Sequence, residues 1–456
     1  MSDDGSGVRI GVLSLHNSKE TKAILNAIED LGHEPHWLRE ENTAVNIEDG
    51  TVELEPDVDL VANRLLLSNT EQPSESLGLA KIYDEVLPVL NSPSSVMTAI
   101  HKFSTATALA EDGIPVPDAL LALSNDRLND GRDKFGEEAV YKTAIGTHGG
   151  GTWKVGADEL VNPRVGDRMA FLQELIERDD TAHRDLRVYV VGDRIVGAMN
   201  RYAPENDWRT NVALGGDVED MTDKIPRDVA DIARDAANTI GLDYAGVDLI
   251  EGHDGWYVLE VNPTAGFKGL FKATGRSAAP YIAQLAIEEA GGSVDEAKVE
   301  DLSASLDDSV PACKPMPKDA PSSEPIVIGY TEEVLVSGTS GSEMATAKSD
   351  TGATRTSIDT KLAAKIGAGP IKSLTRVKSG SRKGSKSRPV VDVVVGVGGN
   401  RHTVTASIED RSHMDYPVLL GRDILKHYQV DVRRRTEEEY SDKEETLEEE
   451  EEEESK

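Results

Sequence analysis

Two short stretches decide how the centre of this chain is expected to fold: Val247-Asp248-Leu249-Ile250 and Leu259-Glu260-Val261-Asn262. Both are apolar runs interrupted by oxygen-bearing side chains, and Gly252-His253-Asp254-Gly255 between them is typical of a hairpin turn. Residues i and i+2 of a strand share a face, so the two polar side chains of the second stretch should point the same way. The hairpin would then direct three oxygen donors at one point: Asp248, Glu260 and Asn262.

Hard oxygen donors, few in number, suit Mg²⁺ that is held jointly with phosphate oxygens. This pattern predicts a protein that uses ATP. Taken singly, Asp248 could instead cap a turn and Glu260 could be a salt-bridge partner.

The composition sets the broad class. The chain has 456 residues, which predicts two or three domains, and a formal net charge of −34. Residues 436–456 hold 13 acids and 2 lysines, so the rest of the chain is strongly acidic as well. With only 4% aromatic residues, this charge favours adaptation to high salt over simple repulsion of polyanions.

Other sequence features indicate a cytoplasmic protein. Cys313 is the single cysteine, so no disulfide within the chain and no cysteine-based metal site can form. The first residues resemble no signal peptide, and no apolar run reaches the roughly 18 residues of a membrane span.

The N-terminal third has the pattern of a parallel α/β sheet. A strand is predicted over 8–15, a helix over 18–31, strands over 34–38 and 59–67, and helices over 77–89 and from 93 to about 112. Further on, 136–142 and 185–200 are predicted as strands, 168–176 as helix or strand, 227–240 as a helix, and 281–289 as the segment that closes this block. Proline-rich residues 291–324 have linker composition, residues from 326 suggest a small all-β domain, and 436–456 suggest a disordered tail.

Two lysines are expected to meet phosphate. Lys102 begins a predicted helix, and Lys142 ends an apolar strand before the glycine-rich run 146–151. Glycines let backbone N–H groups approach phosphate oxygens closely. No Gly-Lys-Ser/Thr follows, so this is not a Walker P-loop.

The order of the motifs resembles the ATP-grasp carboxylate–amine ligases, and most of all the RimK-type α-L-glutamate ligases. The resemblance covers roughly residues 8–290. It is carried by these segments: 173–176, Asp185-Leu186-Arg187-Val188, Trp208-Arg209-Thr210-Asn211 with Gly215-Gly216, Tyr244–Asp248 and Leu259–Asn262. It implies a pre-ATP-grasp α/β domain over 1–95, an α+β ATP-grasp domain over 96–290 and a linker over 291–324.

The resemblance also implies roles for individual residues. ATP would be bound by Lys102, Lys142, Gly146, Gly149, Gly150, Gly151, Gln173, Glu174, Leu175, Ile176, Asp185, Arg209, Thr210 and Asn211. Two Mg²⁺ ions, with Mn²⁺ as a substitute, would be held by Asp248, Glu260 and Asn262. Lys142 and Arg209 would act in catalysis, and Arg201 would hold a substrate carboxylate.

The implied reaction is amide formation through an acyl phosphate. A substrate carboxylate attacks the γ-phosphate, and an amine, expected to be glutamate, then displaces phosphate. The acceptor stays open: a protein C-terminus, a coenzyme tail or an amino-group carrier protein. One departure from the family follows Asn262, where Pro263-Thr264-Ala265-Gly266 replaces the usual small residue and Ser-Pro-Gly.

The C-terminal part contains a second motif, Asp350-Thr351-Gly352. Aspartic peptidases use two aspartates that share one proton, so a single Asp-Thr-Gly would need a second chain. Residues 326–433 resemble a retropepsin-like domain, through 328–329, 350–356, Arg388-Pro389, 410–412 and 419–422. This implies a small all-β domain over 325–433 and a tail over 434–456, with Asp350 as a catalytic residue and a homo-oligomer. The sequence gives no basis for zinc.

Residues 372–388 carry seven cations and no acid, so they could bind a polyanion. An oligo-glutamate chain fits better than nucleic acid, because the net charge of the protein disfavours nucleic-acid binding. The simpler alternative is a solvated loop without a ligand.

Three hypotheses follow for the whole protein. It is a ligase whose β domain trims or binds the product, a peptidase regulated by a nucleotide-binding domain, or a binding module without turnover.

Overall fold

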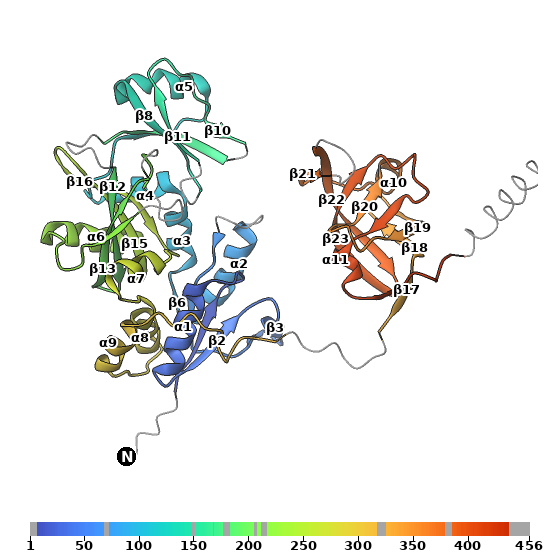
Figure 1. Ribbon diagram of the computed structural model, residues 1–456, viewed down its shortest axis with the longest axis horizontal. Helices are drawn as coiled ribbons and strands as arrows, with labels where there is room; N and C mark the ends of the chain where they lie inside the picture. The colour runs from blue at the N-terminus through green and yellow to red at the C-terminus, as the bar shows by residue number, and fades with distance from the viewer. Residues whose placement is uncertain are drawn as a thin grey trace, which may run out of the picture. The chain divides into compact units, whose positions relative to one another are not determined.

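The computed structural model describes residues 7–67, 73–146, 151–166, 168–176, 183–204, 208–210, 217–316, 325–378 and 385–436. The chain divides into two compact units, residues 1–318 and 319–456. Figure 1 shows the first unit in blue to yellow and the second in orange and red. No helix in the described ranges is both long and apolar enough to cross a membrane.

The first unit begins with a parallel sheet in the order β2-β1-β5-β6. Its strands are β1 (Arg9–Leu13), β2 (Glu34–Leu38), β5 (Leu60–Asn63) and β6 (Val89–Leu90). Helix α1 (Lys19–Asp30) connects β1 to β2, and α2 (Pro73–Asp84) connects β5 to β6, while β3 (Ala44–Glu48) and β4 (Thr51–Glu55) form a hairpin. Helix α1 begins where the Ser18 hydroxyl accepts a hydrogen bond from the Thr21 N–H at 3.0 Å.

The single helix expected from 93 to about 112 is two helices, α3 (Pro93–Ile100) and α4 (Lys102–Glu111). His101 between them has an extended backbone, and its Nδ1 accepts a hydrogen bond from the Ser104 N–H. The break therefore gives α4 a capped start of its own and makes Lys102 its first residue.

A small antiparallel sheet follows, with β7 (Ala119–Leu120) paired to β11 and the others in the order β10-β11-β8-β9. Its strands are β8 (Glu138–Thr143), β9 (Thr152–Gly156), β10 (Arg164–Val165) and β11 (Arg168–Glu174), so the segment left open as helix or strand is a strand. Helix α5 (Asn125–Asp130) and the 3₁₀ helix η2 (Arg132–Phe135) cover this sheet with Leu128 and Phe135.

The larger antiparallel sheet has the order β14-β13-β12-β15-β16. Its strands are β12 (Arg184–Val191), β13 (Arg194–Tyr202), β14 (Val218–Asp220), β15 (Tyr244–Gly252) and β16 (Gly255–Asn262). Alternate residues such as Val188 and Val247 pack on α6 (Arg227–Ile240). On the opposite face, Tyr189 and Tyr244 pack in a core with α7 (Lys268–Thr274) and α8 (Ala279–Glu289), and this face continues into charged residues.

The interval expected as a linker contains a further helix, α9 (Glu296–Ser303). Its Val299 is fully buried in the same core as α1 and α8. Proline and serine flank this helix, which is why composition alone concealed it.

The second unit is a small β domain, as expected. Its main sheet has the order β18-β19-β24-β20-β23-β22-β21, and β18 also pairs with β22, which closes the sheet on itself in a barrel-like way. The strands are β18 (Thr331–Ser337), β19 (Ser342–Ser349), β20 (Ser357–Asp359), β21 (Ser373–Lys378), β22 (Ser385–Val397), β23 (Asn400–Glu409) and β24 (Val418–Leu420). A parallel pair, β17 (Val327–Gly329) and β25 (Gln429–Asp431), and two short helices, α10 (Thr360–Ile366) and α11 (Arg422–Leu425), complete it.

Candidate active site

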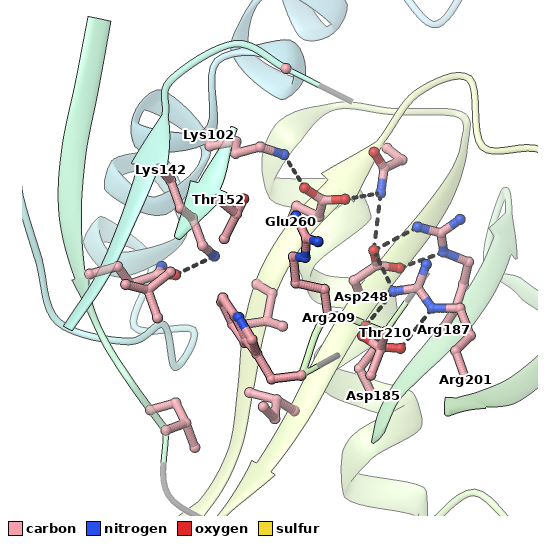
Figure 2. A pocket seen from close by; sticks show the side chains of 18 of the residues that line it. Lys102, Lys142, Thr152, Asp185, Arg187, Arg201, Arg209, Thr210, Asp248 and Glu260 are labelled. Carbon is pink, nitrogen blue, oxygen red and sulfur yellow. Dashed lines mark hydrogen bonds and ion pairs between the residues drawn. The ribbon is translucent and has the colours of Figure 1, made fainter. Parts of the chain in front are cut away.

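The site is a cavity of about 590 Å³ between the two antiparallel sheets of the first unit. One wall comes from β8, β9 and β11, and the other from β12, β13, β15 and β16 (Figure 2). Most of the residues expected at the site line it: Lys102, Lys142, Gly146, Gln173, Glu174, Leu175, Ile176, Asp185, Arg201, Arg209, Thr210, Asp248, Glu260 and Asn262.

The strand register builds a row of opposite charges across the larger sheet. Arg201 lies opposite Asp185, Arg187 lies opposite Asp248, and Asp248 lies opposite Glu260. Because side chains alternate along a strand, all five project from the same face, toward the cavity. A β-bulge after Asp248 keeps this alignment, since Leu249 pairs with Val258 and Leu259 is the extra residue.

Asp248 is the most heavily bonded member of this row. Arg187 donates to both of its carboxylate oxygens, at 2.5 and 2.6 Å, and Arg201 approaches one of them at 2.9 Å. The Asp248 side chain is 3% exposed, and the two guanidinium groups offset the cost of placing a carboxylate in the interior.

The three predicted oxygen donors converge. In this structure the Asn262 Nδ2 donates hydrogen bonds to Glu260 Oε1 at 3.1 Å and to Asp248 Oδ2 at 3.4 Å. Two carboxylates and an amide within this reach fit a Mg²⁺ ion that takes its remaining ligands from phosphate and water. The described ranges hold no cluster of three or more His, Cys, Asp or Glu side chains that could bind a metal by themselves. A Mg²⁺ ion at Asp248, Glu260 and Asn262 would therefore need further ligands from phosphate and water.

Lys102 and Glu260 form an ion pair at the head of α4. Burial by itself would raise the pKa of Glu260, but the Lys102 ammonium, followed by Arg187 and the Asn262 amide, holds this pKa well below its usual range. Glu260 therefore stays ionised and available to a cation.

Lys142 lies on the opposite wall. Its ammonium donates to Gln173 Oε1 at 2.5 Å. Burial, and next the nearby charge of Lys102, lower the pKa of Lys142 from 10.5 to about 8. This lysine is suited to an anionic ligand, because a bound phosphate would stabilise its charged form and raise its pKa again.

At the end of the row, three side chains bind one another: Asp185, Arg201 and Thr210. Arg201 donates to both oxygens of Asp185, at 2.7 and 2.5 Å, and the Thr210 hydroxyl donates to Asp185 Oδ2 at 2.5 Å. Both charged side chains are at least nine-tenths buried. A substrate carboxylate would have to compete with Asp185 and Asp248 for Arg201, so the expected role of Arg201 in gripping substrate stays a prediction.

The glycine-rich run is described only at its ends. Gly149, Gly150 and also Asn211 lie outside the described residues. Gly151 is described but does not line the cavity; it has a φ of +100°, and a Cβ there would lie 2.6 Å from Thr143 Oγ1. Glycine is required at this position for close packing on β8.

Several residues of the site have no role predicted from the sequence. Arg187 was noticed only as part of a motif, although its i+2 spacing from Asp185 predicts that both face the same way. Thr152 and Lys154 of β9, Trp208 and Leu66 also line the cavity, and Lys154 Nζ lies 5.5 Å from the centre of the Trp208 ring. Nothing in their local sequence separates them from ordinary strand and loop residues.

The second unit brings its own motif together. The Asp350 N–H donates to the Leu420 carbonyl, and the Arg422 N–H donates to the Ala353 carbonyl. The Asp423 carboxylate accepts hydrogen bonds from the Thr356 N–H and hydroxyl at 3.0 and 2.8 Å. The Asp-Thr-Gly turn is thus docked on the segment that follows β24. The Asp350 carboxylate accepts hydrogen bonds from the N–H groups of Gly352 and Ala353, at 2.9 and 3.2 Å.

Comparison with known proteins agrees with this division. Residues 99–286 match the RimK-like ATP-grasp domain, and residues 363–439 match the retropepsin-like aspartic endopeptidase RimB. The chain is 37% identical over 202 residues to the tetrahydromethanopterin:alpha-L-glutamate ligase of Methanocaldococcus jannaschii, covering 42% of this chain and 68% of that protein. It is 30% identical over 302 residues to the probable alpha-L-glutamate ligase 2 of Hahella chejuensis, covering 62% and 96%.

Among solved structures, that of the ATP-grasp ligase PsnB complexed with minimal precursor superposes with a TM-score of 0.50 at 23% identity, covering 63% of this chain and all of PsnB. That likeness concerns the fold. Fold and site together define an ATP-grasp ligase, a class that uses ATP and Mg²⁺. The chain belongs to the RimK-type α-L-glutamate ligase family, and a RimB-like, retropepsin-like domain follows its ligase part. The RimB-like match begins at residue 363 and does not include Asp350.

Proposed function

We propose that this protein joins an amino acid, expected to be glutamate, to a carboxylate acceptor through an acyl-phosphate intermediate. The observation that carries the proposal is the convergence of Asp248, Glu260 and Asn262 beside Lys102, facing Lys142 across the cavity. This arrangement offers oxygen donors to a metal–phosphate group and two ammonium groups to the phosphates themselves.

The reaction would proceed in two steps. The acceptor carboxylate oxygen attacks the γ-phosphorus of ATP, and the bond to the β,γ-bridging oxygen breaks to release ADP. The neutral amine then attacks the acyl carbon, inorganic phosphate leaves, and the amine gives up one proton. Bound Mg²⁺, as two ions with Mn²⁺ as a substitute, would neutralise charge on the phosphates.

The residues of the chain would contribute position and charge. Lys102 and Lys142 would bind phosphate oxygens, and Arg209, which lines the cavity, would stabilise the transferred phosphoryl group. Arg187 and Arg201 would hold the Asp248 carboxylate in position toward the metal.

The adenine would lie beside residues 173–176. The Glu174 N–H already donates to the Asp118 carbonyl, so we expect Leu175 and Ile176 to contact the base. Gln173 would act indirectly, since it is 3% exposed and accepts the hydrogen bond of Lys142.

The acceptor remains to be identified by experiment. The relatives are named for glutamate ligation, one of them on tetrahydromethanopterin, so a coenzyme tail and a protein C-terminus are both to be tested. The full chain would be incubated with Mg²⁺-ATP, each amino acid in turn and a fractionated cell extract, with ADP release and product mass as readouts. We expect ADP release that needs both acceptor and amino acid, and a mass increase of one amino-acid residue. ATP binding without turnover for any combination would contradict the proposal.

We further propose that the β domain trims or binds the product, with Asp350 of two chains forming one catalytic pair. The docked Asp-Thr-Gly turn, whose carboxylate accepts hydrogen bonds from the Gly352 and Ala353 N–H groups, favours this role. The alternative is a peptidase controlled by the nucleotide-binding unit. Cleavage that changes with ATP while no amide product forms would favour that alternative.

The basic residues of 372–388 are the proposed contact for an acidic chain. The two whose side chains are described at its ends, Lys372 and Arg388, pair with Asp392 and Glu409. An anionic product would have to displace these pairs, and nucleic acid is not part of the proposal.

A further inference from the structure

A second candidate site lies at the carboxyl edge of the N-terminal parallel sheet. In the order β2-β1-β5-β6, the strand that follows β1 in sequence is added on one side of the sheet, whereas the strand that follows β5 is added on the other side. Such a reversal leaves a crevice outside the ends of the two central strands, where ligands bind in open α/β sheets. Residues 14–18, which follow β1 and lead into α1, and residues 64–67, which follow β5, border it.

Arg64 makes this crevice chemically unusual. The residue is 3% exposed, so its side chain is buried. Its backbone N–H donates a hydrogen bond to the Leu13 carbonyl. Among the described residues its guanidinium has no hydrogen bond and no ion pair, and its Nε is a buried donor without a partner. An equally buried arginine, Arg132, also has a buried Nε without a partner, but its two terminal nitrogens donate to the carbonyls of Gly136, Glu137 and Val155. A buried cation without such partners is costly, unless a ligand completes it.

The neighbours of Arg64 fit an anion. His16 follows β1, and its Nδ1 is 3.3 Å from the Ser14 hydroxyl. Burial, and then the positive charge of Arg64, lower the pKa of His16, while Glu20 in the first turn of α1 opposes this. The α1 N-terminus opens on the same loop and adds a partial positive charge.

This crevice adjoins the ATP cavity. Leu66, two residues after Arg64, lines that cavity, and so does Gly266. A Cβ added at Gly266 would lie 3.1 Å from Glu20 Oε1. The Glu20 carboxylate therefore lies beside a residue that lines the ATP cavity.

We propose that Arg64 and His16 bind a carboxylate of the amino-acid substrate, whose amine is directed past Glu20 toward the ATP cavity. The arrangement matches an amino acid: its anionic end meets the unpaired guanidinium, and its cationic end meets a carboxylate beside the reaction centre. The inference rests on the proposed ligase function. It also gives the substrate carboxylate a partner other than Arg201, whose Nε and one terminal nitrogen already bind Asp185 and Asp248.

The test compares Arg64→Met and Arg64→Lys with Arg227→Met, which changes an exposed arginine at the start of α6. For Arg64→Met we expect the KM of the amino acid to rise about ten- to a hundredfold, as for loss of a charge-assisted hydrogen bond, with kcat and the KM of ATP unchanged. Arg64→Lys should fall between this variant and the wild type, and Arg227→Met should match the wild type.

Melting temperature separates this role from a structural one. Because Arg64→Met removes a buried charge that has no partner, its melting temperature should equal or exceed that of the wild type. An unchanged KM for the amino acid, a rise in the KM of the acceptor instead, or a fall in melting temperature with all kinetic constants affected together would overturn the proposal.

Failure of the ligase proposal would be visible separately, as absence of ADP release by the wild type with every amino acid. In that case equilibrium dialysis of the full chain with L-glutamate decides the question. Binding that is lost in Arg64→Met and kept in Arg227→Met supports the site, whereas equal binding by all variants, or none by the wild type, overturns it.

Discussion

The two units of this protein differ in the groups that contact their key carboxylates. In the ligase unit, Asp248, Asp185 and Glu260 are each matched by a cation from a neighbouring strand or helix, namely Arg187, Arg201 and Lys102. In the β domain, Asp350 is held by two backbone N–H groups of its own turn. The first site is built from residues of one chain, whereas the proposed pair of Asp350 residues would need a second chain.

The difference indicates what each site needs in order to work. A balanced row of charges is pre-organised for phosphate and metal, so its activity should depend on single residues and not on protein concentration. A lone aspartate can share a proton only with a second one, so any cleavage should depend on association of two chains.

The largest expected effect is from Asp248→Asn, which leaves Arg187 without its carboxylate. We expect ADP release to fall by about 10²–10³-fold and the free energy of unfolding by about 3–5 kcal/mol. A coupled ADP assay and urea denaturation measure the two effects. The exposed Asp254→Asn in the adjacent hairpin turn is the matched control and should behave as the wild type. Retention of both activity and stability would show that the row of charges is dispensable.

Asp350→Asn should distinguish the activities of the two units. Any peptide cleavage should be abolished, because the pair loses its shared proton, while ADP release should stay within about twofold of the wild type. Cleavage by the wild type, measured with a fluorogenic acidic peptide, should rise with the square of chain concentration when most chains are monomeric. Asp415→Asn, an exposed change in the same unit, should leave cleavage intact. Cleavage that persists in Asp350→Asn would remove this residue from the mechanism.

A smaller effect is expected from the titration of Lys142. Its pKa in the folded protein is about 8, below the usual 10.5, so between these values the unfolded chain binds more protons and stability rises with pH. Lys142→Met should lack this gain, so the wild type should become more stable relative to the variant by about 2 kcal/mol from pH 8 to 10.5.

Urea denaturation across this pH range measures the difference. Lys81→Met serves as the control, because Asp84 and Glu85 raise the pKa of the exposed Lys81 and no such gain should appear. A constant difference between wild type and Lys142→Met would contradict a lowered pKa for Lys142.

The smallest effect concerns salt. A net charge of −34 should make the folded chain self-repelling at low ionic strength, and the screening length falls from about 10 Å at 0.1 M to about 3 Å at 1 M salt. We therefore expect the melting temperature to rise by about a few degrees between 0.1 and 1 M KCl, as in a protein adapted to high salt. A steady decrease would argue against this adaptation.

Local patterns predicted the elements that depend on local rules. The alternation around Asp248 and Glu260 predicted the hairpin and the convergence of its polar side chains, and the Ala-rich face of 227–240 predicted α6. The break at His101 was missed because the helical pattern continues across it, and only the extended backbone at His101 separates α3 from α4.

Long-range pairing set the limits of sequence reasoning. Asp185 and Arg201 were assigned to nucleotide and substrate, yet strand register places them opposite each other, where they bind one another. The β-bulge at Leu259 and the burial of Arg64 likewise depend on contacts between strands distant in sequence. Such contacts leave no periodic signal in a single chain.

Helix α9 has a practical consequence for dividing this protein. Beyond this helix, Asn26 of α1 donates hydrogen bonds to the Asp307 and Ser309 carbonyls, Lys19 pairs with Asp308, and Cys313 packs into the core that contains Trp37. A ligase fragment cut at residue 290 would expose an apolar groove along α1 and α8, while one cut at 316 would keep it covered. The same burial raises the pKa of the Cys313 thiol to about 11, so the single cysteine stays protonated and should resist alkylation until the fragment unfolds.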